Sequence, residues 1–392
     1  MRPIDWVCCG LLLTVGTMFA QTPASPAPAV KTDVPATQGE MLSRKEVTEI
    51  IANSRKIVSP NGVEELLPIP VNGMQQWLSI RGRDRRNPIL MVLHGGPGSP
   101  TMPEDYTFQS SWEDYFTVVE WDQRGAGKTY ASNDPKALAG TVTVEQMTSD
   151  AEVVVRYLQK TYGKKKIFLL GHSWGSVLGV ELAQRHPEWF YAYLGVGQVV
   201  NMQKSEKIGY EFALQQAREH HNDDAEKELL AIAPYPGAAG SITFAKIGVQ
   251  RKWLTYYGGN TYGRTTFAYD ANAWELSPDY TDEDLGKLDE GSLYSVTQLV
   301  GPLEALSFDA VTTFKCPVFL FDGRHDYATS HELAVDWFKK IKAPKKEFVW
   351  FDNSSHMVMQ EEPGRFLYRL LTDVRPLAAA SSDVAPEYEV LH

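Results

Sequence analysis

The chain has 392 residues, of which 43% are apolar and 11% aromatic, so it can bury one large core, and its length alone allows two or three units. Its formal net charge of −11 argues against a nucleic-acid partner, because no stripe dense in Lys and Arg is present to neutralise phosphates. The longest basic run, Lys164 to Lys166, we interpret as the end of a helix.

Residues 1–20 have the layout of a secretory signal peptide. Arg2 lies near the start, an apolar run extends from Trp6 to Phe19, and Ala20 precedes the expected cleavage point. The apolar run is too short for a comfortable membrane span, so we expect an exported protein, periplasmic or secreted, without stable membrane insertion after cleavage. A retained anchor is the alternative.

The next segment, residues 21–41, is rich in Pro, Ala and Thr and cannot bury enough apolar surface to fold, so we interpret it as a disordered linker. Cys8 and Cys9 would leave with the signal peptide, and the mature chain would keep only Cys316. It would therefore have no disulfide framework and no cysteine metal site.

The folded part begins with three expected strands and one helix. Gln75 to Arg81 looks like an edge strand, whereas Ile89–Leu93 is a continuous apolar run of strand length, typical of a central parallel strand covered on both faces. Thr117–Trp121 is the next expected strand. Thr143 with Gln146 resembles a capping box and starts a helix that ends at Gly163.

The stretch around Ser173 predicts a nucleophile. Lys166 to Leu170 forms a buried strand, Gly171-His172-Ser173-Trp174-Gly175 a sharp turn, and Ser176 to Arg185 a helix. Such a turn strains its central residue and requires glycine where a β-carbon would collide with the adjoining strand or helix. Ser173 would then stand exposed above the sheet, with the helix N-terminus directed at it.

The strand Ile89–Leu93 ends in His94-Gly95-Gly96-Pro97-Gly98, a loop whose backbone can approach a ligand closely. We expect the Gly96 N–H and the Trp174 N–H to form a two-donor oxyanion hole for acyl transfer. The alternative is a plain glycine-rich turn.

Two other motifs are rejected. The run from Asp122 to Thr129 imitates a phosphate-binding loop, but that loop requires glycine at 122, so we expect Asp122 and Arg124 to brace the loops above the sheet. The pair His220-His221 lacks the carboxylate–histidine spacing of a metal site.

Residues 201–301 break the alternation of strands and helices with helical segments rich in acids and aromatics, and a loop-like stretch from Tyr256 to Tyr280. We expect an inserted helical cap that acts as a lid over Ser173.

The alternation resumes with strands over Val318–Phe321 and Glu347–Phe351, and a last helix over Pro363–Thr372. Asp326 follows the first strand and His356 the second, so the fold class is α/β with a mostly parallel sheet and the chain order is Ser, Asp, His. His356 would act as general base and acid, and Asp326 would orient it. The competing candidates are His94, His172, His325 and His331 for the base, and Asp322 and Asp352 for the acid.

Together these motifs resemble the prolyl aminopeptidase (proline iminopeptidase) group of α/β-hydrolases over about residues 60–200 and 302–372. The residues that carry the resemblance are His94-Gly95-Gly96-Pro97-Gly98, Asp122-Gln123-Arg124-Gly125, Gly171-His172-Ser173-Trp174-Gly175-Ser176, Gly323-Arg324-His325-Asp326 and Ser355-His356. From the pattern along the chain we expect the hydrolase core over residues 42–200 and 302–373, the cap over 201–301, and a C-terminal tail over 374–392.

Members of that group hold the substrate's free amine with cap glutamates, and Trp274-Glu275 looks like the family's Trp-Glu pair. The resemblance therefore makes Glu275 a candidate for amine binding, with Glu211 as a rival. We expect no cofactor and no metal. The leading hypothesis is an exported serine aminopeptidase that releases proline or another small residue; a carboxylesterase for small acyl esters and a non-catalytic binding protein are the alternatives.

Overall fold

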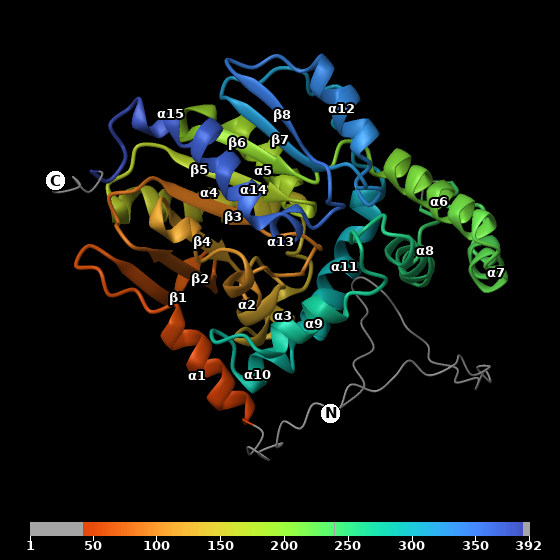
Figure 1. Ribbon diagram of the computed structural model, residues 1–392, viewed down its shortest axis with the longest axis horizontal. Helices are drawn as coiled ribbons and strands as arrows, with labels where there is room; N and C mark the ends of the chain where they lie inside the picture. Colours follow the sequence, from red (N-terminus) through yellow and green to blue (C-terminus); the bar gives the residue numbers. More distant parts are fainter. Residues whose placement is uncertain (1–41, 239, 387–392) are drawn as a thin grey trace, which may run out of the picture.

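The computed structural model describes residues 42–238 and 240–386, and its centre is an eight-stranded sheet (Figure 1). The strand order is β1-β2-β4-β3-β5-β6-β7-β8; the pairs β1–β2 and β2–β4 are antiparallel, and every other pair is parallel. The predicted mostly parallel α/β sheet is thus confirmed. The strands are β1 (Val63–Val71), β2 (Met74–Gly82), β3 (Ile89–Leu93), β4 (Thr117–Trp121), β5 (Ile167–His172), β6 (Phe190–Val196), β7 (Val318–Gly323) and β8 (Lys346–Phe351).

The strand predicted over Gln75–Arg81 is confirmed as β2, but its predicted place at the edge is wrong, because β1 pairs with β2 along its whole length and takes the edge. β1 contains Pro68 and Pro70, which cannot donate to a ladder and are tolerated at an edge. The hairpin closes through Asn72 (φ 43°) and Gly73 (φ 85°), and positive φ at both central residues suits the right-handed twist of a two-residue hairpin.

Helices cover both faces of the sheet, and alternate residues of a strand enter two separate cores. Met91 of β3 packs with α4 and α5, whereas Leu90 and Val92 pack with the C-terminal helices. The helices of the core are α1 (Arg44–Ser54), α2 (Gly127–Ala131), α3 (Pro135–Leu138), α4 (Val144–Tyr162), α5 (Trp174–Arg185), α12 (His331–Lys340), α13 (Val358–Glu361), α14 (Pro363–Arg369), the π-helical turn Leu370–Val374 and α15 (Pro376–Ala379), with 3₁₀ turns at Asp105–Thr107, Trp112–Asp114 and Pro187–Trp189.

The segment predicted as a C-terminal tail continues the packed structure as far as residue 386. Val374 and Ala378 are fully buried and Ala385 nearly so, because these apolar side chains complete the core on their face of the sheet. The predicted helix over Pro363–Thr372 is therefore only the first part of a longer helical segment.

Between β6 and β7 lies a helical insertion at the carboxyl end of the parallel strands (Figure 1). Its outer part has a small core of its own around Tyr210, Leu229 and Trp253. The stretch expected to be loop-like contains α9, so that expectation is wrong in part. The cap helices are α6 (Met202–Glu219), α7 (Asp223–Ala231), α8 (Phe244–Tyr256), α9 (Ala268–Glu275), α10 (Asp282–Leu285) and α11 (Leu288–Glu304).

A buried ion cluster fastens the residue after α1 to the core. Arg55 donates to Asp105 at 2.7 Å and to Glu113 at 3.2 Å, and these three side chains are at most 5% exposed. Arg81 of β2 also donates to Glu113, at 2.9 Å. Paired burial of this kind keeps the carboxylates compensated.

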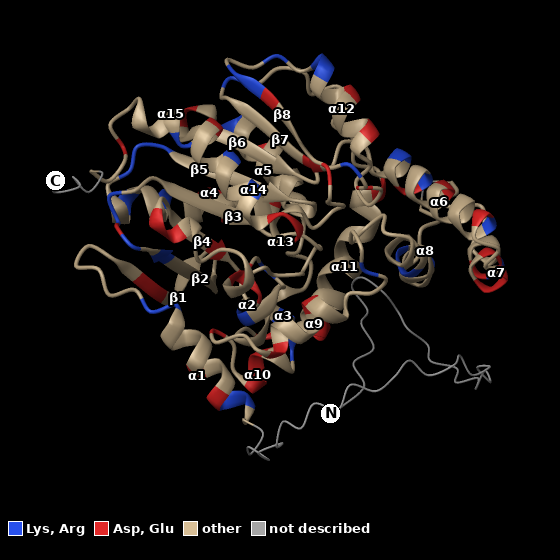
Figure 2. Cartoon of the chain, in the orientation of Figure 1, with Lys and Arg blue, Asp and Glu red and all other residues tan. Residues whose placement is uncertain are grey.

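Charged residues of both signs are interspersed over core and cap in the view of Figure 2, without a basic stripe. Within the two described ranges, none of the helices combines the length and apolar character needed to cross a membrane. The predicted signal peptide and the predicted linker both lie outside the described residues.

Candidate active site

The turn between β5 and α5 holds Ser173 in a strained conformation, with φ 54° and ψ −121°. Positive φ is uncommon for a residue with a β-carbon, and it persists only where the surrounding structure imposes it. Here the Ser173 N–H donates to the Val196 carbonyl of β6 at 2.9 Å. A β-carbon at Gly171 would lie 2.5 Å from the Gly175 carbonyl oxygen, and one at Gly175 would overlap the Leu93 carbonyl, which confirms the steric reason for both glycines.

Asp326 and His356 follow β7 and β8 and meet above the sheet. His356 Nδ1 lies 2.7 Å from Asp326 Oδ2. Asp326 also accepts hydrogen bonds from the N–H groups of Ala328 (2.8 Å) and Thr329 (3.0 Å) and from the Thr329 hydroxyl (2.9 Å). Burial alone would raise the pKa of Asp326, but His356 and these donors lower it to about 2, so the carboxyl is ionised.

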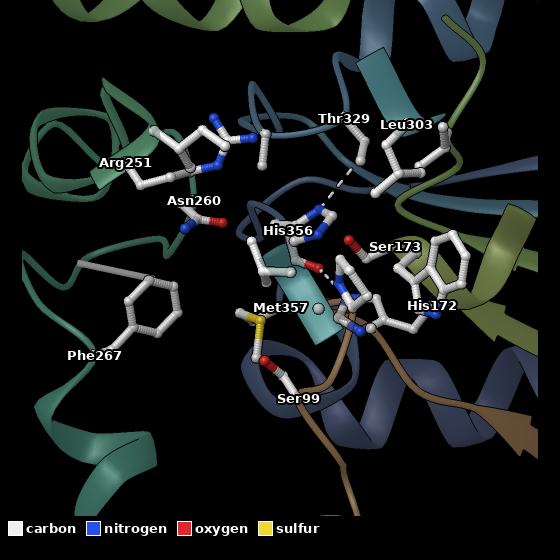
Figure 3. Close-up of a pocket in the computed structure, with 18 of the residues that line it drawn as sticks. Ser99, His172, Ser173, Arg251, Asn260, Phe267, Leu303, Thr329, His356 and Met357 are labelled. Carbon is white, nitrogen blue, oxygen red and sulfur yellow. Dashed lines mark hydrogen bonds between the residues drawn. The ribbon is translucent and has the colours of Figure 1, made fainter. Parts of the chain in front are cut away.

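Ser173 and His356 line one cavity beneath the cap, together with Gly96 and Trp174. Figure 3 shows the Ser173 hydroxyl beside the His356 ring, with Phe267 farther out in the cavity. Asp326 is fully buried behind His356. The structure therefore brings together Ser173, His356 and Asp326, the residues that the sequence predicts as nucleophile, base and acid.

The two expected oxyanion donors also face this cavity. Trp174 is the first residue of α5, where a backbone N–H has no partner within the helix, and Gly96 adopts φ 106°. Within the described ranges, neither N–H donates a hydrogen bond to another residue. A β-carbon at Gly95 would lie 3.2 Å from the Ser173 Cβ, so the glycine loop lies directly against the nucleophile.

The competing histidines occupy other positions. Burial lowers the pKa of His94 to about 4, and burial together with the nearby His356 lowers that of His172 to about 3, so both rings are neutral at pH 7. His172 Nε2 lies 3.0 Å from the His356 carbonyl oxygen, which is a supporting contact. The His325 ring stacks on Tyr262, and His331 Nδ1 lies 2.8 Å from the Asp326 carbonyl oxygen.

The competing acids lie away from His356. Burial, with Asp326 nearby, raises the pKa of Asp322 well above its usual range. Asp352 is exposed and pairs with Arg324 at 2.9 Å. Among these acids, only Asp326 contacts the base.

The bracing role predicted above the sheet is observed. Arg124 donates to both oxygens of Asp150, at 2.6 and 3.0 Å, and Asp122 accepts from the Lys128 N–H at 2.6 Å and the Tyr280 hydroxyl at 2.5 Å. In the described part of the chain, no group of three or more His, Cys, Asp or Glu side chains is arranged to hold a metal ion.

Neither predicted amine-binding glutamate lies in the cavity. Glu211 is exposed on α6 beside Lys207, and Glu275 is exposed at the end of α9, where its backbone carbonyl accepts a bond from Arg44 at 2.7 Å. Sequence reasoning instead missed four carboxyl groups that line the cavity: Glu104, Glu206, Asp270 and Glu304.

Two of these four, Glu104 and Asp270, form a pair between core and cap. They are 3% and 5% exposed. Gln360 donates to Glu104 at 3.0 Å, and Arg264 lies 3.3 Å from Asp270. Burial, followed by the charge of Asp270, raises the pKa of Glu104 to about 8, and burial raises the pKa of Asp270. At neutral pH the pair thus retains a proton that a bound cation could replace.

A second carboxyl, Glu206, is already compensated. Arg251 donates to both of its oxygens, and the Tyr235 hydroxyl donates to it at 2.5 Å. Of these two carboxyl sites, only the Glu104–Asp270 pair contains a carboxyl group, Glu104, for which the described residues supply no ion-pair partner.

Comparison with known proteins identifies the class. The family model of the alpha/beta hydrolase fold matches residues 88–363, and the chain belongs to this family, so it is a hydrolase. Its relatives include the probable aminopeptidase YbaC of Bacillus subtilis (strain 168), 30% identical over 313 residues that make up 78% of this chain and 95% of that protein. The proline iminopeptidase of Neisseria gonorrhoeae is 38% identical over 99 residues, 25% of this chain and 29% of that protein.

Among solved structures, a proline iminopeptidase-related protein of Thermus thermophilus matches with a TM-score of 0.56 at 21% identity, covering 81% of this chain and 98% of that one. At that identity the match shows the fold alone. The resemblance to the proline iminopeptidase group that the motifs indicated is confirmed by these relatives together.

Proposed function

We propose that this hydrolase is a serine aminopeptidase that releases an N-terminal proline or another small residue from peptides. One observation carries the proposal. The strained Ser173 faces His356, which bonds to Asp326 at 2.7 Å, in a cavity that also holds the buried Glu104–Asp270 pair. A nucleophile and a buried carboxyl pair that retains a proton, both in one cavity, suit a substrate that has a carbonyl and a free amine.

In the proposed reaction, His356 removes the proton of Ser173 as the hydroxyl oxygen attacks the scissile carbonyl. The Gly96 and Trp174 N–H groups stabilise the resulting oxyanion, each by about 3 kcal/mol. The C–N bond then breaks, the protonated His356 gives its proton to the leaving amine, and water hydrolyses the acyl-enzyme through the same base. Ionised Asp326 stabilises the imidazolium in both halves.

Recognition of the amine is proposed to rest on Glu104 and Asp270. Arg264 lies 3.3 Å from Asp270 and 3.9 Å from Glu361, so two carboxyl groups share one guanidinium, while Glu104 has no ion-pair partner among the described residues. A substrate ammonium would restore the balance and replace the retained proton. Apolar rings of Phe267 and Trp274 also line the cavity and suit a small apolar residue such as proline.

A second candidate is a carboxylesterase for small acyl esters. A specific observation favours it: part of the cavity wall is apolar and would accept an acyl chain without a free amine. That wall consists of Ile242, Phe244, Ile247, Val296, Val300 and Leu303.

Export is part of the proposal and rests on residues 1–20 of the sequence. Sequencing the N-terminus of the mature protein tests it, with a new terminus at Gln21 as the expected result. An unprocessed Met1 terminus in the exported fraction would contradict cleavage.

The activity is tested by comparing proline-, alanine- and leucine-naphthylamide with a short-chain nitrophenyl ester, with Ser173→Ala as control. We expect rapid release from proline substrates, lost when the amine is blocked. Glu104→Gln should raise KM about tenfold or more for naphthylamides and leave ester KM within about twofold, since it removes one charge-assisted contact.

The exposed Glu275→Gln variant is the matched control and should behave as the wild type. Ester cleavage indifferent to the amine would favour the carboxylesterase, and retained turnover in Ser173→Ala would exclude serine catalysis.

A further inference from the structure

One short segment of the cap lies against the two loops that carry Asp326 and His356. This segment, residues 258–264, is called the cap loop below. The Tyr327 N–H donates to the Gly259 carbonyl at 2.9 Å, and the His356 N–H donates to the Asn260 carbonyl at 3.2 Å. The cap is therefore hydrogen-bonded directly to the backbone of the proposed base and of the residue after the proposed acid.

The cap loop keeps a fixed shape of its own. It is bounded by Gly258 (φ 80°) and Gly263 (φ 67°), a backbone conformation that favours glycine. Between them Thr261 is fully buried and its hydroxyl donates to the Arg264 carbonyl at 3.1 Å. A loop fixed in this way can position the backbone of Tyr327 and His356, to which it is hydrogen-bonded.

A third connection runs through Glu361, at the end of α13. Its Oε1 accepts a bond from the Tyr262 N–H of the cap loop at 2.5 Å, and its Oε2 accepts one from the Ser355 N–H at 2.7 Å. Its side chain is 4% exposed. One carboxylate thus joins the cap to the residue that immediately precedes His356.

We propose that Glu361 is a positioning residue for His356, and that the cap loop belongs to the catalytic frame as well as covering the substrate. The inference rests on the proposed function, in which His356 is the base. Both carboxylate oxygens meet backbone N–H donors, so an amide in their place would turn an NH₂ group toward one donor. The Ser355–His356 backbone would shift, and misplacement of a catalytic group by about 1 Å can cost about a hundredfold in rate.

The neighbouring Glu362 provides a matched control. Its Oε2 accepts from the Asn353 N–H at 3.0 Å and from the Ser354 hydroxyl at 2.9 Å, so it supports the same loop without reaching the cap. Because only one of its oxygens is used in these two bonds, a glutamine can keep them.

The test measures kcat and KM of Glu361→Gln and Glu362→Gln on a short-chain nitrophenyl ester, a substrate that needs no amine contact. We expect Glu361→Gln to lower kcat at least about tenfold with KM within about twofold, and Glu362→Gln to leave both within about twofold. Thermal unfolding of each variant reports whether the fold is kept. Equal kcat in the two variants would overturn the inference.

If Glu361→Gln does not fold, Tyr262→Pro deletes the N–H on the cap side, at a residue that is 39% exposed. The same loss of kcat is expected, and wild-type kcat would overturn the inference. Ser173→Ala in the same assay separates the two proposals. Retained turnover in Ser173→Ala would refute the serine mechanism. If Ser173→Ala is inactive but the Glu361 variant keeps the wild-type kcat, only the positioning role is refuted.

Discussion

Replacing Ser173 by glycine is expected to abolish activity and to stabilise the fold relative to Ser173→Ala. At φ 54° and ψ −121° a residue with a β-carbon carries strain of about 1–3 kcal/mol, which serine and alanine share and glycine avoids. Glycine loses about 0.5–1 kcal/mol more than alanine through its greater freedom in the unfolded chain. The difference leaves Ser173→Gly more stable than Ser173→Ala by about 1 kcal/mol.

Urea unfolding of the two inactive variants measures this difference, provided that their m values agree. Ala52→Gly, at an exposed position in α1, is the control for the usual effect of replacing alanine by glycine, because glycine should lower the free energy of unfolding by about 1 kcal/mol at an ordinary helical site. A Ser173→Gly variant less stable than Ser173→Ala would refute the strain argument. It would mean that the turn around the nucleophile is relaxed despite its positive φ.

Two further predictions concern buried charge. Arg55→Ala should lower the free energy of unfolding by about 3 kcal/mol or more in denaturant titrations, because it removes a partner from the buried Asp105 and Glu113. Arg83→Ala, which breaks a half-exposed pair with Asp114, should cost less than about 1 kcal/mol. Similar costs for the two variants would contradict the stabilising role of the buried ion cluster. Glu104 has a pKa of about 8 in the fold against its usual 4.5, so the stability from its protonated form is full below pH 4.5 and is lost as pH rises to 8. The stability of Glu104→Gln relative to the wild type should therefore rise across that pH interval. Thermal unfolding of both proteins at pH 5 and pH 9 measures this change. The same stability difference at both pH values would refute the shifted pKa.

Strand β3 could be predicted from sequence because burial on both faces leaves a continuous apolar run, and both β3 and β4 have the predicted bounds. β1 escaped detection because Pro68, Pro70 and two glutamates break its pattern. The dipeptide Asn72-Gly73 was the available signal, since this pair favours a two-residue hairpin. Edge strands tolerate such residues because only one side needs a ladder.

The proposed catalytic residues could be located because each one follows a parallel strand, and the carboxyl ends of parallel strands meet at one edge of the sheet. Ser173 follows β5, Asp326 follows β7 and His356 follows β8. The contacts of the cap could not be predicted in the same way. The hydrogen bond that Glu361 accepts from the Tyr262 N–H of the cap loop depends on how two segments about a hundred residues apart pack, and no local pattern encodes that.

The proposed amine site shows how one wrong assignment of secondary structure displaced the candidate residue. Trp274-Glu275 indicated Glu275, but α9 turns by about 100° per residue, so when the buried Trp274 lines the cavity its neighbour points to solvent. Residues four apart share a helix face, and Asp270 accordingly lies beside Trp274 in the cavity. The sequence pattern of Tyr256–Tyr280 predicts a loop, and the four-residue spacing between Asp270 and Trp274 has no meaning for a shared face in a loop. Had the segment been recognised as helical, the same Trp274 would have led to Asp270 instead of Glu275.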